Sequence, residues 1–547
     1  MPYTDDYRFE IRETCLGDAL DQAAGRWDGR IGWVFGEEQI GFSEMRQRTD
    51  AVAASLLALG IRPGDVVAVW TPNLAAFAYC EFACAKVGAI IAAINTRSKS
   101  FELEHVLQHS DARLLVMVDA FLKHDFAATL AELAPLAERG PDGRVRASRL
   151  PHLERVVSLS PKPAPGALCW EDFLALGRDI PREALRQRQG ERHWSEPVVL
   201  QYTSGTTALP KGALCNHRYV LNFGIAFLKP TGLNGGDVFL NTQPFYHVGG
   251  SCGALPVPLA EGTKVVSAEY YETETILRLI ERERCTIRSG YGAMYVMEMS
   301  HPRFREFDIS SLRGGWCVGT PALMQRVMDE MNLPGLVQIY GATEGGGTSG
   351  HPAEPREERA ATCGRPVHGT EFAIQDPETG AFLPAGQTGE VLLRGWWKMN
   401  GYLKQPDATA KTIDPDGWVH TGDLGSLDAQ GRLIFASRLK DMLKIGGENV
   451  SAEEVESVLL GHPKVVQAAV IGAPDDRLTE VVMAIVEPRE GETVTSEEIV
   501  SFCVQRMANF RVPRYVRLIA EWPLTGSGKI QKHKLRETFL ADFRKAS

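Results

Sequence analysis

Short runs of aliphatic and β-branched residues alternate with segments of helical periodicity along most of the chain. Four of these runs, at 66–70 (VVAVW), 89–94 (AIIAAI), 198–202 (VVLQY) and 263–267 (TKVVS), are predicted to form strands. Helical segments are predicted between and after these runs. One begins near Thr273, and another has Pro321 in its first turn, a position that accepts proline. Strands that alternate with helices at this spacing are typical of βαβ units and parallel sheets. The pattern therefore predicts a large N-terminal α/β body of parallel-type sheets.

One apolar stretch, at 76–94, is about as long as a membrane span, but Glu81 and Lys86 interrupt it. It is therefore predicted to be a buried helix that runs into a strand. The first ten residues, MPYTDDYRFE, are acidic where a signal peptide would be basic and then apolar. We therefore expect a cytoplasmic protein without integral membrane contact.

The pattern changes near Ser437. Before this residue, the segment 421–437 (TGDLGSLDAQGRLIFAS) predicts a small β-rich element with a turn at 428–431. After it, Ser451 and Glu454 have the spacing of a capping box ahead of an apolar helical face. A strand (VVQAAVIG) and further mixed elements follow. The sequence therefore predicts an N-terminal domain at 1–437 and a small α+β C-terminal domain at 438–547.

The composition sets broad limits on function. Of the 547 residues, 44% are hydrophobic and 23% are charged, which is typical of a globular protein with several folding units. The formal net charge of −10 argues against a nucleic-acid partner, because such proteins usually carry a basic face. The ten cysteines show no metal-ligand spacing, and Cys80 and Cys84 are predicted to be small core residues. This usage favours a reducing compartment.

The segment 202–213 (YTSGTTALPKGA) follows a predicted strand and precedes a helix expected to begin near His217. Glycines let a backbone approach phosphates closely, and hydroxyl groups and main-chain amides donate hydrogen bonds to phosphate oxygens. The segment lacks the GK[ST] ending of a Walker loop. Taken alone, it is either a polyphosphate-binding loop or an ordinary glycine- and threonine-rich surface loop.

Four further motifs follow in order: 338–347 (QIYGATEGGG), 420–425 (HTGDLG), 437–450 (SRLKDMLKIGGENV) and 523–532 (PLTGSGKIQK). Together with the loop, this set resembles the adenylate-forming superfamily, which includes acyl-CoA synthetases, peptide-synthetase adenylation domains and firefly luciferase. The resemblance spans nearly the whole chain. It implies that ATP activates a carboxylic acid as an acyl-adenylate, that pyrophosphate leaves, and that the acyl group is then transferred.

The resemblance also implies residues for the first half-reaction. Glu344 would bind Mg²⁺ with Thr206, since an acidic residue in a phosphate site makes chemical sense as a metal ligand. Lys529 would stabilise the adenylation transition state, and Thr343 would lie near the α-phosphate. The remaining cofactor-binding residues implied are Thr203, Ser204, Gly205, Thr206, Thr207 and Lys211 at the phosphates, Tyr340 at the adenine, Asp423 at the ribose with Arg438 as its companion at the hinge, and Gly319, Thr320, Pro321 and Gly341.

For the second half-reaction, the family rotates its C-terminal domain, and the resemblance places the hinge at 438–441 with Lys440 as the hinge residue. The C-terminal domain would therefore be mobile. Gly446 and Gly447 would face the pantetheine tunnel, with Lys444 nearby. His247 resembles the family's gate between carboxylate and thiol, and its alternative role is that of a core histidine at a strand end.

The same resemblance limits which acid and which acyl acceptor are expected. The C-terminal third looks most like medium-chain fatty-acid and alicyclic-acid CoA ligases, and no carrier domain follows the last motif, so free CoA is the expected acceptor. The implied acyl pocket is mostly apolar: Phe245, Gly249, Tyr291, Trp316, Gly345 and Gly346. Trp316 would shorten this pocket, whereas the glycine run at 345–347 would widen it.

Three hypotheses follow. The first is an acyl-CoA ligase that uses ATP, Mg²⁺ and CoA on a small apolar carboxylic acid. The second is an adenylating enzyme that passes the acyl group to a separate carrier protein or an amine, and the third is a non-catalytic nucleotide-binding relative. A homodimer is compatible with all three. Ala208 and Ser437 stand where the family usually has glycine, and neither change removes a charge.

Overall fold

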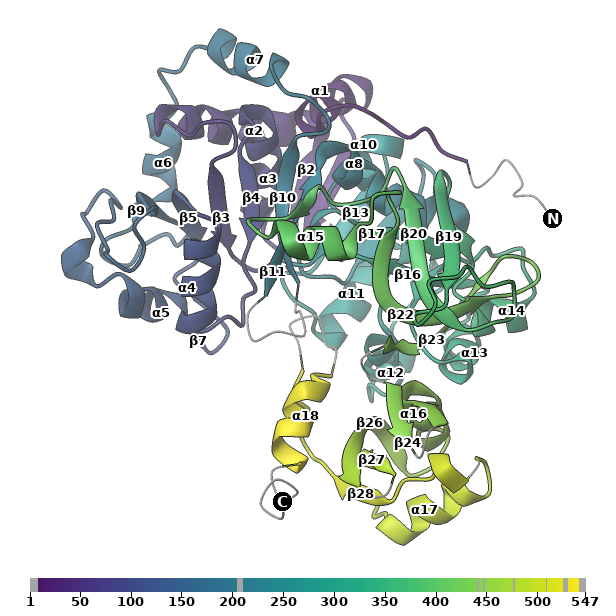
Figure 1. The fold of residues 1–547 in the computed structure, drawn as a ribbon. Helices are drawn as coiled ribbons and strands as arrows, with labels where there is room; N and C mark the ends of the chain where they lie inside the picture. Colours follow the sequence, from purple (N-terminus) through teal and green to yellow (C-terminus); the bar gives the residue numbers. More distant parts are fainter. Residues whose placement is uncertain are drawn as a thin grey trace. The chain divides into compact units, whose positions relative to one another are not determined.

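A computed structural model describes residues 8–203, 210–439, 442–445, 448–475, 478–507, 509–524 and 530–540 (Figure 1). The chain forms two compact units, Met1–Glu371 with Leu393–Val419 and Phe372–Leu392 with His420–Ser547. The mixed α/β class predicted from the sequence is confirmed, with parallel sheets in the first unit. The functional boundary at 437/438 and the hinge at 438–441 stay predictions, because residues 440 and 441 lie outside the described part of the chain.

The first unit contains an eight-stranded sheet in the order β21-β11-β10-β4-β3-β5-β8-β9. Its strands are β3 (Val66–Trp70), β4 (Ile90–Ala93), β5 (Leu114–Met117), β8 (Arg155–Ser158), β9 (Leu168–Cys169), β10 (Pro197–Thr203), β11 (Lys211–Asn216) and β21 (Gly401–Tyr402). Neighbours from β10 through β9 pair in parallel, and β11 and β21 add antiparallel strands at one edge. The predicted strands at 66–70, 89–94 and 198–202 all lie in this sheet.

A nine-stranded sheet has the order β18-β17-β16-β15-β14-β12-β13-β1-β2. Its strands are β1 (Ile31–Phe35), β2 (Glu38–Gly41), β12 (Val238–Asn241), β13 (Lys264–Ser267), β14 (Ile287–Arg288), β15 (Gly314–Cys317), β16 (Gly335–Ala342), β17 (Gly345–Ser349) and β18 (Arg365–Pro366). The strands from β1 to β16 pair in parallel, whereas β2, β17 and β18 pair antiparallel at the edges.

The helices of the first unit form layers around these sheets. They are α1 (Leu16–Arg26), α2 (Phe42–Ala58), α3 (Ala75–Val87), α4 (Ser100–His109), α5 (Phe126–Leu133), α6 (Trp170–Leu176), α7 (Arg182–Gly190), α8 (His217–Leu228), α9 (Val248–Ser251), α10 (Val257–Glu261), α11 (Thr273–Glu283), α12 (Gly292–Met299), α13 (Pro321–Glu330), α14 (Arg356–Ala361) and α15 (Pro406–Thr412). The predicted helix starts at Thr273 and His217 are confirmed.

The alternation of side chains along each strand explains the layers, because successive residues face opposite sides of a sheet. Val67 of β3 and Trp33 of β1 belong to one core, which also contains α1, α2, α3, α8 and α10 and therefore lies between the two sheets. Trp70 faces the opposite side, toward α4 and α5. Val34 faces α11, α13 and α14.

Helix α3 lies in the central core, which is why apolar residues lie on every side of it and only Glu81 and Lys86 are charged. The predicted buried helix followed by a strand at 76–94 is thus confirmed. Cys80 and Cys84 are buried core residues, as expected, and none of the ten cysteines, all within the described residues, forms a disulfide. Among the described helices, none is both long and apolar enough to cross a membrane.

The second unit is built on two sheets. One has the order β19-β20-β22-β23 and the other β25-β24-β27-β26, with β28 beside β27. The elements are β19 (Thr370–Gln375), β20 (Gly389–Gly395), β22 (Val419–Leu427), β23 (Leu433–Arg438), β24 (Met442–Ile445), β25 (Glu448–Ser451), β26 (Val465–Asp475), β27 (Thr479–Pro488), β28 (Tyr515–Leu518), α16 (Ala452–Leu460), α17 (Ser496–Val504) and α18 (Lys532–Phe539).

Local signals in this unit are mostly confirmed. The predicted turn joins β22 to β23, where the amide of Gly431 donates to the carbonyl of Asp428 at 2.9 Å. Ser451 caps α16 by accepting from the amide of Glu454 at 3.3 Å. The carboxylate of Glu454 instead pairs with Arg511 at 3.1 Å. The predicted capping box is thus corrected to a serine cap, because a cationic partner from a distant segment takes the glutamate.

Candidate active site

The proposed phosphate loop connects the two strands of an antiparallel hairpin. Thr203, at the end of β10, lies opposite Lys211, at the start of β11. The sequence-based expectation of a strand, a loop and then a helix is corrected here, since β11 intervenes before α8 and contains Lys211. Residues 204–209, which include the predicted phosphate ligands Ser204, Gly205, Thr206 and Thr207 as well as Ala208, lie outside the described residues.

Two histidines of α4 contact both ends of this loop. Nε2 of His105 lies 3.0 Å from the carbonyl oxygen of Pro210, and because a carbonyl only accepts, Nε2 is the donor. Nδ1 of His109 lies 3.0 Å from the hydroxyl of Tyr202. Burial lowers the pKa of His109, and the neighbouring His105 and Lys404 lower it further. The flanks of the loop are therefore fixed by side chains that no sequence motif singled out.

Glu344 lies in the turn between β16 and β17, and the described neighbours of this turn hold it at three points. The hydroxyl of Tyr219 donates to the carbonyl of Thr343 at 3.0 Å. The amide of Met399 donates to the carbonyl of Glu344 at 2.9 Å. The hydroxyl of Tyr402 donates to Oε1 of Glu344 at 2.6 Å. Both predicted residues of this motif thus lie on a backbone that is fixed from outside the motif.

The glycine run after Glu344 packs closely against its neighbours. A Cβ on Gly345 would lie 2.5 Å from the carbonyl oxygen of Trp397, and one on Gly346 would lie 2.8 Å from Leu393. Both glycines have positive φ, at 149° and 72°. A Cβ on Gly347 would also meet Trp397, at 2.9 Å. The expectation that this run widens the acyl pocket is corrected, because the space beside each glycine is filled by protein atoms.

The remaining predicted cofactor-binding residues of the first unit are well defined. Thr320 caps α13, its hydroxyl accepting from the amide of Leu323 at 3.3 Å, and Pro321 occupies the first turn as its position predicts. Gly319 precedes them. Tyr340 lies on β16 with only 9% of its surface exposed. A Cβ on Gly341 would meet the ring of Phe227 at 2.9 Å, so this position requires glycine for close packing.

His247 caps the short helix α9. Its Nδ1 accepts from the amide of Gly249 at 3.1 Å, so the neutral ring carries its proton on Nε2. A Cβ on Gly249 would lie 3.1 Å from Gln243 and 3.3 Å from His247. Phe245 is completely buried between Phe35 and Phe77, so its ring belongs to the aromatic core.

The predicted acyl wall has an aromatic pair. The rings of Tyr291 and Trp316 meet edge to face, with centroids 6.1 Å apart. The hydroxyl of Tyr295 donates to the carbonyl of Trp316 at 2.8 Å, which fixes the backbone that carries the indole. Burial raises the pKa of Tyr291 to about 12, so its hydroxyl keeps its proton at neutral pH. The wall is thus bulky, neutral and held from behind.

The two residues predicted to act at the ribose lie in the second unit, opposite each other on two paired strands. Asp423 of β22 is the direct cross-strand partner of Arg438 of β23. Glu390 fixes the segment before Asp423: its Oε1 accepts from the amide of Gly422 at 3.0 Å, and its Oε2 lies 3.0 Å from Nδ1 of His420. Sequence reasoning missed Glu390, because the contact joins segments about thirty residues apart.

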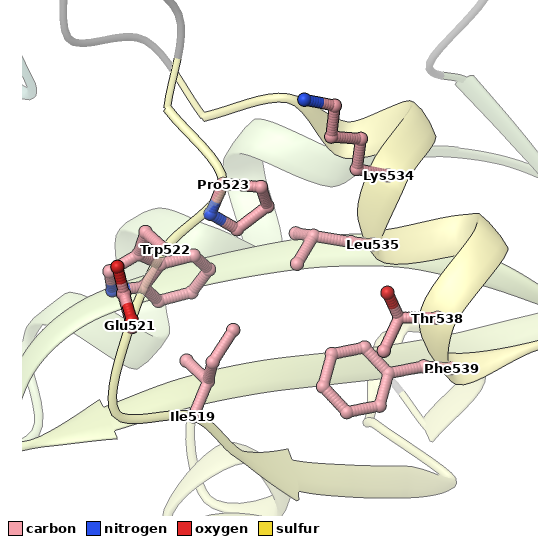
Figure 2. Close-up of a pocket in the computed structure, with 8 residues that line it drawn as sticks. All are labelled: Ile519, Glu521, Trp522, Pro523, Lys534, Leu535, Thr538 and Phe539. Atoms are coloured by element: carbon pink, nitrogen blue, oxygen red, sulfur yellow. The ribbon is translucent and has the colours of Figure 1, made fainter. Parts of the chain in front are cut away.

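Four of the other predicted C-terminal residues lie outside the described residues: Lys440, Gly446, Gly447 and Lys529. Lys444 is described only as part of the backbone of β24. The two ends of the Lys529 segment are joined, since Leu524 and Ile530 form a β-bridge and the amide of Gln531 donates to the carbonyl of Pro523 at 2.7 Å. A surface groove of about 470 Å³ lies beside this stem (Figure 2). The groove is lined by Ile519, Glu521, Trp522, Pro523, Lys534, Leu535, Thr538 and Phe539.

The donor set at Glu344 suits a metal ion that arrives with its substrate. Among the described residues, no cluster of three or more histidine, cysteine, aspartate or glutamate side chains is arranged to hold a metal ion. Mg²⁺ is usually bound by one or two carboxylates together with substrate phosphates. The Glu344 carboxylate, linked through Tyr402 to Lys211 at the end of the proposed phosphate loop, fits that pattern.

The chain is similar to known proteins along nearly its whole length. Residues 20–403 match the family model described as AMP-binding enzyme, and residues 454–529 match that of the AMP-binding enzyme C-terminal domain. The mitochondrial medium-chain acyl-CoA ligase ACSF2 of Mus musculus is 34% identical over 548 residues, which cover 98% of this chain and 88% of that protein.

Two solved structures share the fold. The anthranilate CoA ligase AuaEII, in complex with anthranoyl-AMP, is 26% identical with a TM-score of 0.83, covering 98% of each chain. The amide bond synthetase McbA from Marinactinospora thermotolerans is 27% identical with a TM-score of 0.80, covering 96% of this chain and 99% of the other.

Proposed function

This chain belongs to the AMP-binding enzyme family, and we propose that within it the protein is an ATP-dependent acyl-CoA ligase. In the first step, a carboxylate oxygen of the acid forms a bond to the α-phosphorus of ATP, and pyrophosphate leaves. In the second step, the sulfur of CoA bonds to the acyl carbon, AMP leaves, and the thiol proton is released.

The observation that carries this proposal is the turn of Thr343 and Glu344 held beside strand β11. The backbone of Tyr402 pairs with Ala213 of β11, and its hydroxyl donates to Glu344. Tyr402 thus connects the strand that follows the proposed phosphate loop to the carboxylate, and we assign both to one site. The similarity to a named acyl-CoA ligase over 98% of the chain supports the same reaction class.

Mg²⁺ would be held by Glu344 together with the phosphates, and it would supply charge stabilisation for the departing pyrophosphate. Lys211, at the start of β11, adds positive charge on the same side of the loop. Thr206 is the second proposed ligand of the metal. Because adenylation concentrates negative charge, a site of this kind accelerates it by binding the transition state more tightly than the substrates.

The second unit would complete each half-reaction in turn. Asp423 and Arg438, opposite each other on β22 and β23, would bind the ribose. Lys529 would act in adenylation, and rotation about Lys440 would then bring Gly446 and Gly447 to the CoA path. The proposed domain boundary at 437/438 follows from this cycle, which also includes His247 as the gate to the thiol.

The proposed acid is a medium-chain, alicyclic or similar apolar acid. The edge-to-face pair of Tyr291 and Trp316 forms a neutral and largely buried wall, which suits a hydrocarbon or ring rather than a charged group. The relative from Mus musculus is named a medium-chain acyl-CoA ligase, in agreement with this class. A cytoplasmic location and a homodimer stay predictions, and that relative is named as mitochondrial.

A second candidate function has specific support. The amide bond synthetase McbA shares the fold at a TM-score of 0.80, so transfer of the acyl group to an amine is the alternative outcome of the same adenylation step. The two functions differ only in the acceptor.

The purified protein is therefore incubated with ATP, Mg²⁺, CoA and a panel of fatty, aromatic, alicyclic and steroid acids, and the products are identified by mass spectrometry. A CoA thioester confined to one acid class supports the ligase and identifies its substrate. Acyl-AMP that accumulates with CoA present, and forms an amide when amines are added, moves the alternative to first place. If no acid yields either product, the proposed function is wrong.

A further inference from the structure

Tyr402 connects two parts of the proposed ATP site. Its hydroxyl donates to Oε1 of Glu344 at 2.6 Å. Nζ of Lys211 lies over its ring, 5.0 Å from the centroid. The phenol therefore lies between the cation at the end of the phosphate loop and the carboxylate that would hold Mg²⁺, and it contacts both.

The backbone of Tyr402 is fixed before its side chain makes these contacts. Its amide donates to the hydroxyl of Thr409 at 2.8 Å, and its carbonyl accepts from the amide of Gln405 at 3.2 Å. It also pairs with Ala213 across β11 and β21. The preceding Gly401 has a φ of 140°, and a Cβ there would lie 2.9 Å from Thr409, so the turn into β21 requires glycine. The direction of the hydroxyl is thus set by the fold.

The hydroxyl is the donor of this hydrogen bond, because a carboxylate oxygen without a proton can only accept. Hydrogen bonds to carboxylates are among the stronger ones in proteins. Oε1 is therefore held in one place, and the position of the whole carboxylate is restricted.

We propose that Tyr402 is a positioning residue for the first half-reaction, which orients the Glu344 carboxylate toward Mg²⁺ carried by ATP and couples it to Lys211 at the phosphate loop. This inference rests on the proposed function. It adds a residue that acts through Glu344. Sequence patterns did not indicate it, because Tyr402 lies 58 residues after Glu344 in the chain.

The test measures the Kd for ATP by calorimetric titration of the full-length protein without any acid. One titration contains Mg²⁺, and a second contains EDTA instead. Tyr402→Phe removes the hydroxyl and keeps the ring over which Lys211 lies. We expect the Kd for ATP with Mg²⁺ to rise about tenfold, the loss typical of one hydrogen bond to a charged group. The Kd for AMP should stay within about twofold, since AMP lacks the β- and γ-phosphates; a general disturbance of the unit would weaken both ligands.

Tyr79→Phe is the matched control, because Tyr79 is another buried tyrosine of the same unit and lies on α3. It should bind ATP as the unchanged protein does. A double-mutant cycle with Glu344→Gln then identifies the route of action. If Tyr402 acts through the carboxylate, Tyr402→Phe should have little further effect once Glu344 is changed, and fully additive losses would overturn the inference.

The same variants separate this inference from the proposed function. In the pyrophosphate-exchange assay, Tyr402→Phe should raise the KM for ATP, while thioester formation from supplied acyl-AMP should be unchanged. If the unchanged protein forms a thioester and Tyr402→Phe binds ATP with Mg²⁺ equally well, the inference is wrong and the function stands. If ATP binding weakens as expected but no acid yields a product, the function is wrong and the positioning role stands.

Discussion

Arg288 and Glu298 form an ion pair whose side chains are both completely buried. Nη2 of Arg288 lies 3.0 Å from Oε1 of Glu298, and the hydroxyl of Tyr271 donates to the same oxygen at 3.0 Å. The guanidinium also lies 4.0 Å from the ring centroid of Tyr295, whose hydroxyl holds the carbonyl of Trp316. Burial acts to lower the pKa of Arg288, but Glu298, Tyr295 and Tyr271 together outweigh it and raise the pKa. The pair supports the proposed acyl wall from behind.

Arg288→Met is expected to destabilise the protein by about 3–5 kcal/mol, because it leaves Glu298 buried without its partner. Chemical denaturation measures this change. The double variant Arg288→Met with Glu298→Leu is the control, and it should recover most of the loss, since it removes both charges. A double variant no more stable than the single one would show that packing, rather than the unpaired charge, accounts for the effect.

Glu81 gives a prediction of pH dependence. It lies on α3, fully buried, and neither carboxylate oxygen has a hydrogen-bond partner among the described residues. Burial raises the pKa of Glu81 well above its ordinary value, with a smaller contribution from Cys252. Glu81 therefore keeps its proton in the folded protein.

The sign follows from proton binding. Above a pH of about 4.3, a glutamate in the unfolded chain ionises while Glu81 in the folded chain does not. The free energy of unfolding is thus expected to fall by up to about 1.4 kcal/mol per pH unit as the pH rises toward the folded-state pKa. Glu81→Gln removes this pH dependence. The free energy of unfolding of the variant, relative to that of the unchanged protein, should therefore rise from pH 5 to pH 8. Parallel denaturation curves across that range would show that Glu81 ionises in the folded state.

Trp316→Ala should broaden the acids that are accepted. The indole is 7% exposed and contacts Tyr291 edge to face, so its loss leaves room in the proposed pocket. We expect activity to extend toward longer or bulkier acids in the mass-spectrometric panel, with a loss of about 3–5 kcal/mol in stability. Tyr291→Phe, which keeps the ring, is the control for specificity. An unchanged acid profile in a folded Trp316→Ala protein would place the pocket elsewhere.

Glu390 should affect nucleotide binding through the backbone of the ribose motif. Glu390→Ala removes the acceptor of the Gly422 amide and the partner of His420, so Asp423 loses its support. We expect the KM for ATP to rise about tenfold, which corresponds to about 1.4 kcal/mol. Glu390→Gln keeps an acceptor for the Gly422 amide and should lose less. Equal effects of the two substitutions would indicate that charge, and not the backbone contact, is what matters.

Lys529→Ala separates the two half-reactions. Adenylation should fall by at least about a hundredfold, because a positive charge is lost from a transition state that gathers anions. Thioester formation from supplied acyl-AMP should be largely intact. Both are followed by product analysis with the same enzyme preparation. An equal loss in both half-reactions would contradict the proposed rotation of the C-terminal domain.

The local elements of this fold were predictable because each depends on neighbouring residues. The parallel strands, the helix that begins at Thr273, Pro321 in the first turn of α13 and the serine cap at Ser451 all follow from periodicity or capping within a few positions. The hairpin that contains Lys211 was missed, since β11 is a strand through its pairing with β10 and β21 rather than through its own pattern. Contacts across the sheet decide such cases.

The sequence by itself determined the reaction class, because chemistry depends on residue types in a fixed order: the loop at 202–213, Glu344, Asp423 and Lys529 are already visible as motifs. Only the tertiary structure decided which groups hold those motifs in place. Tyr402 reaches Glu344 across 58 positions, and Glu390 reaches His420 across 30. Such contacts leave no local pattern, since they arise only when distant strands pair and direct two side chains toward the same point.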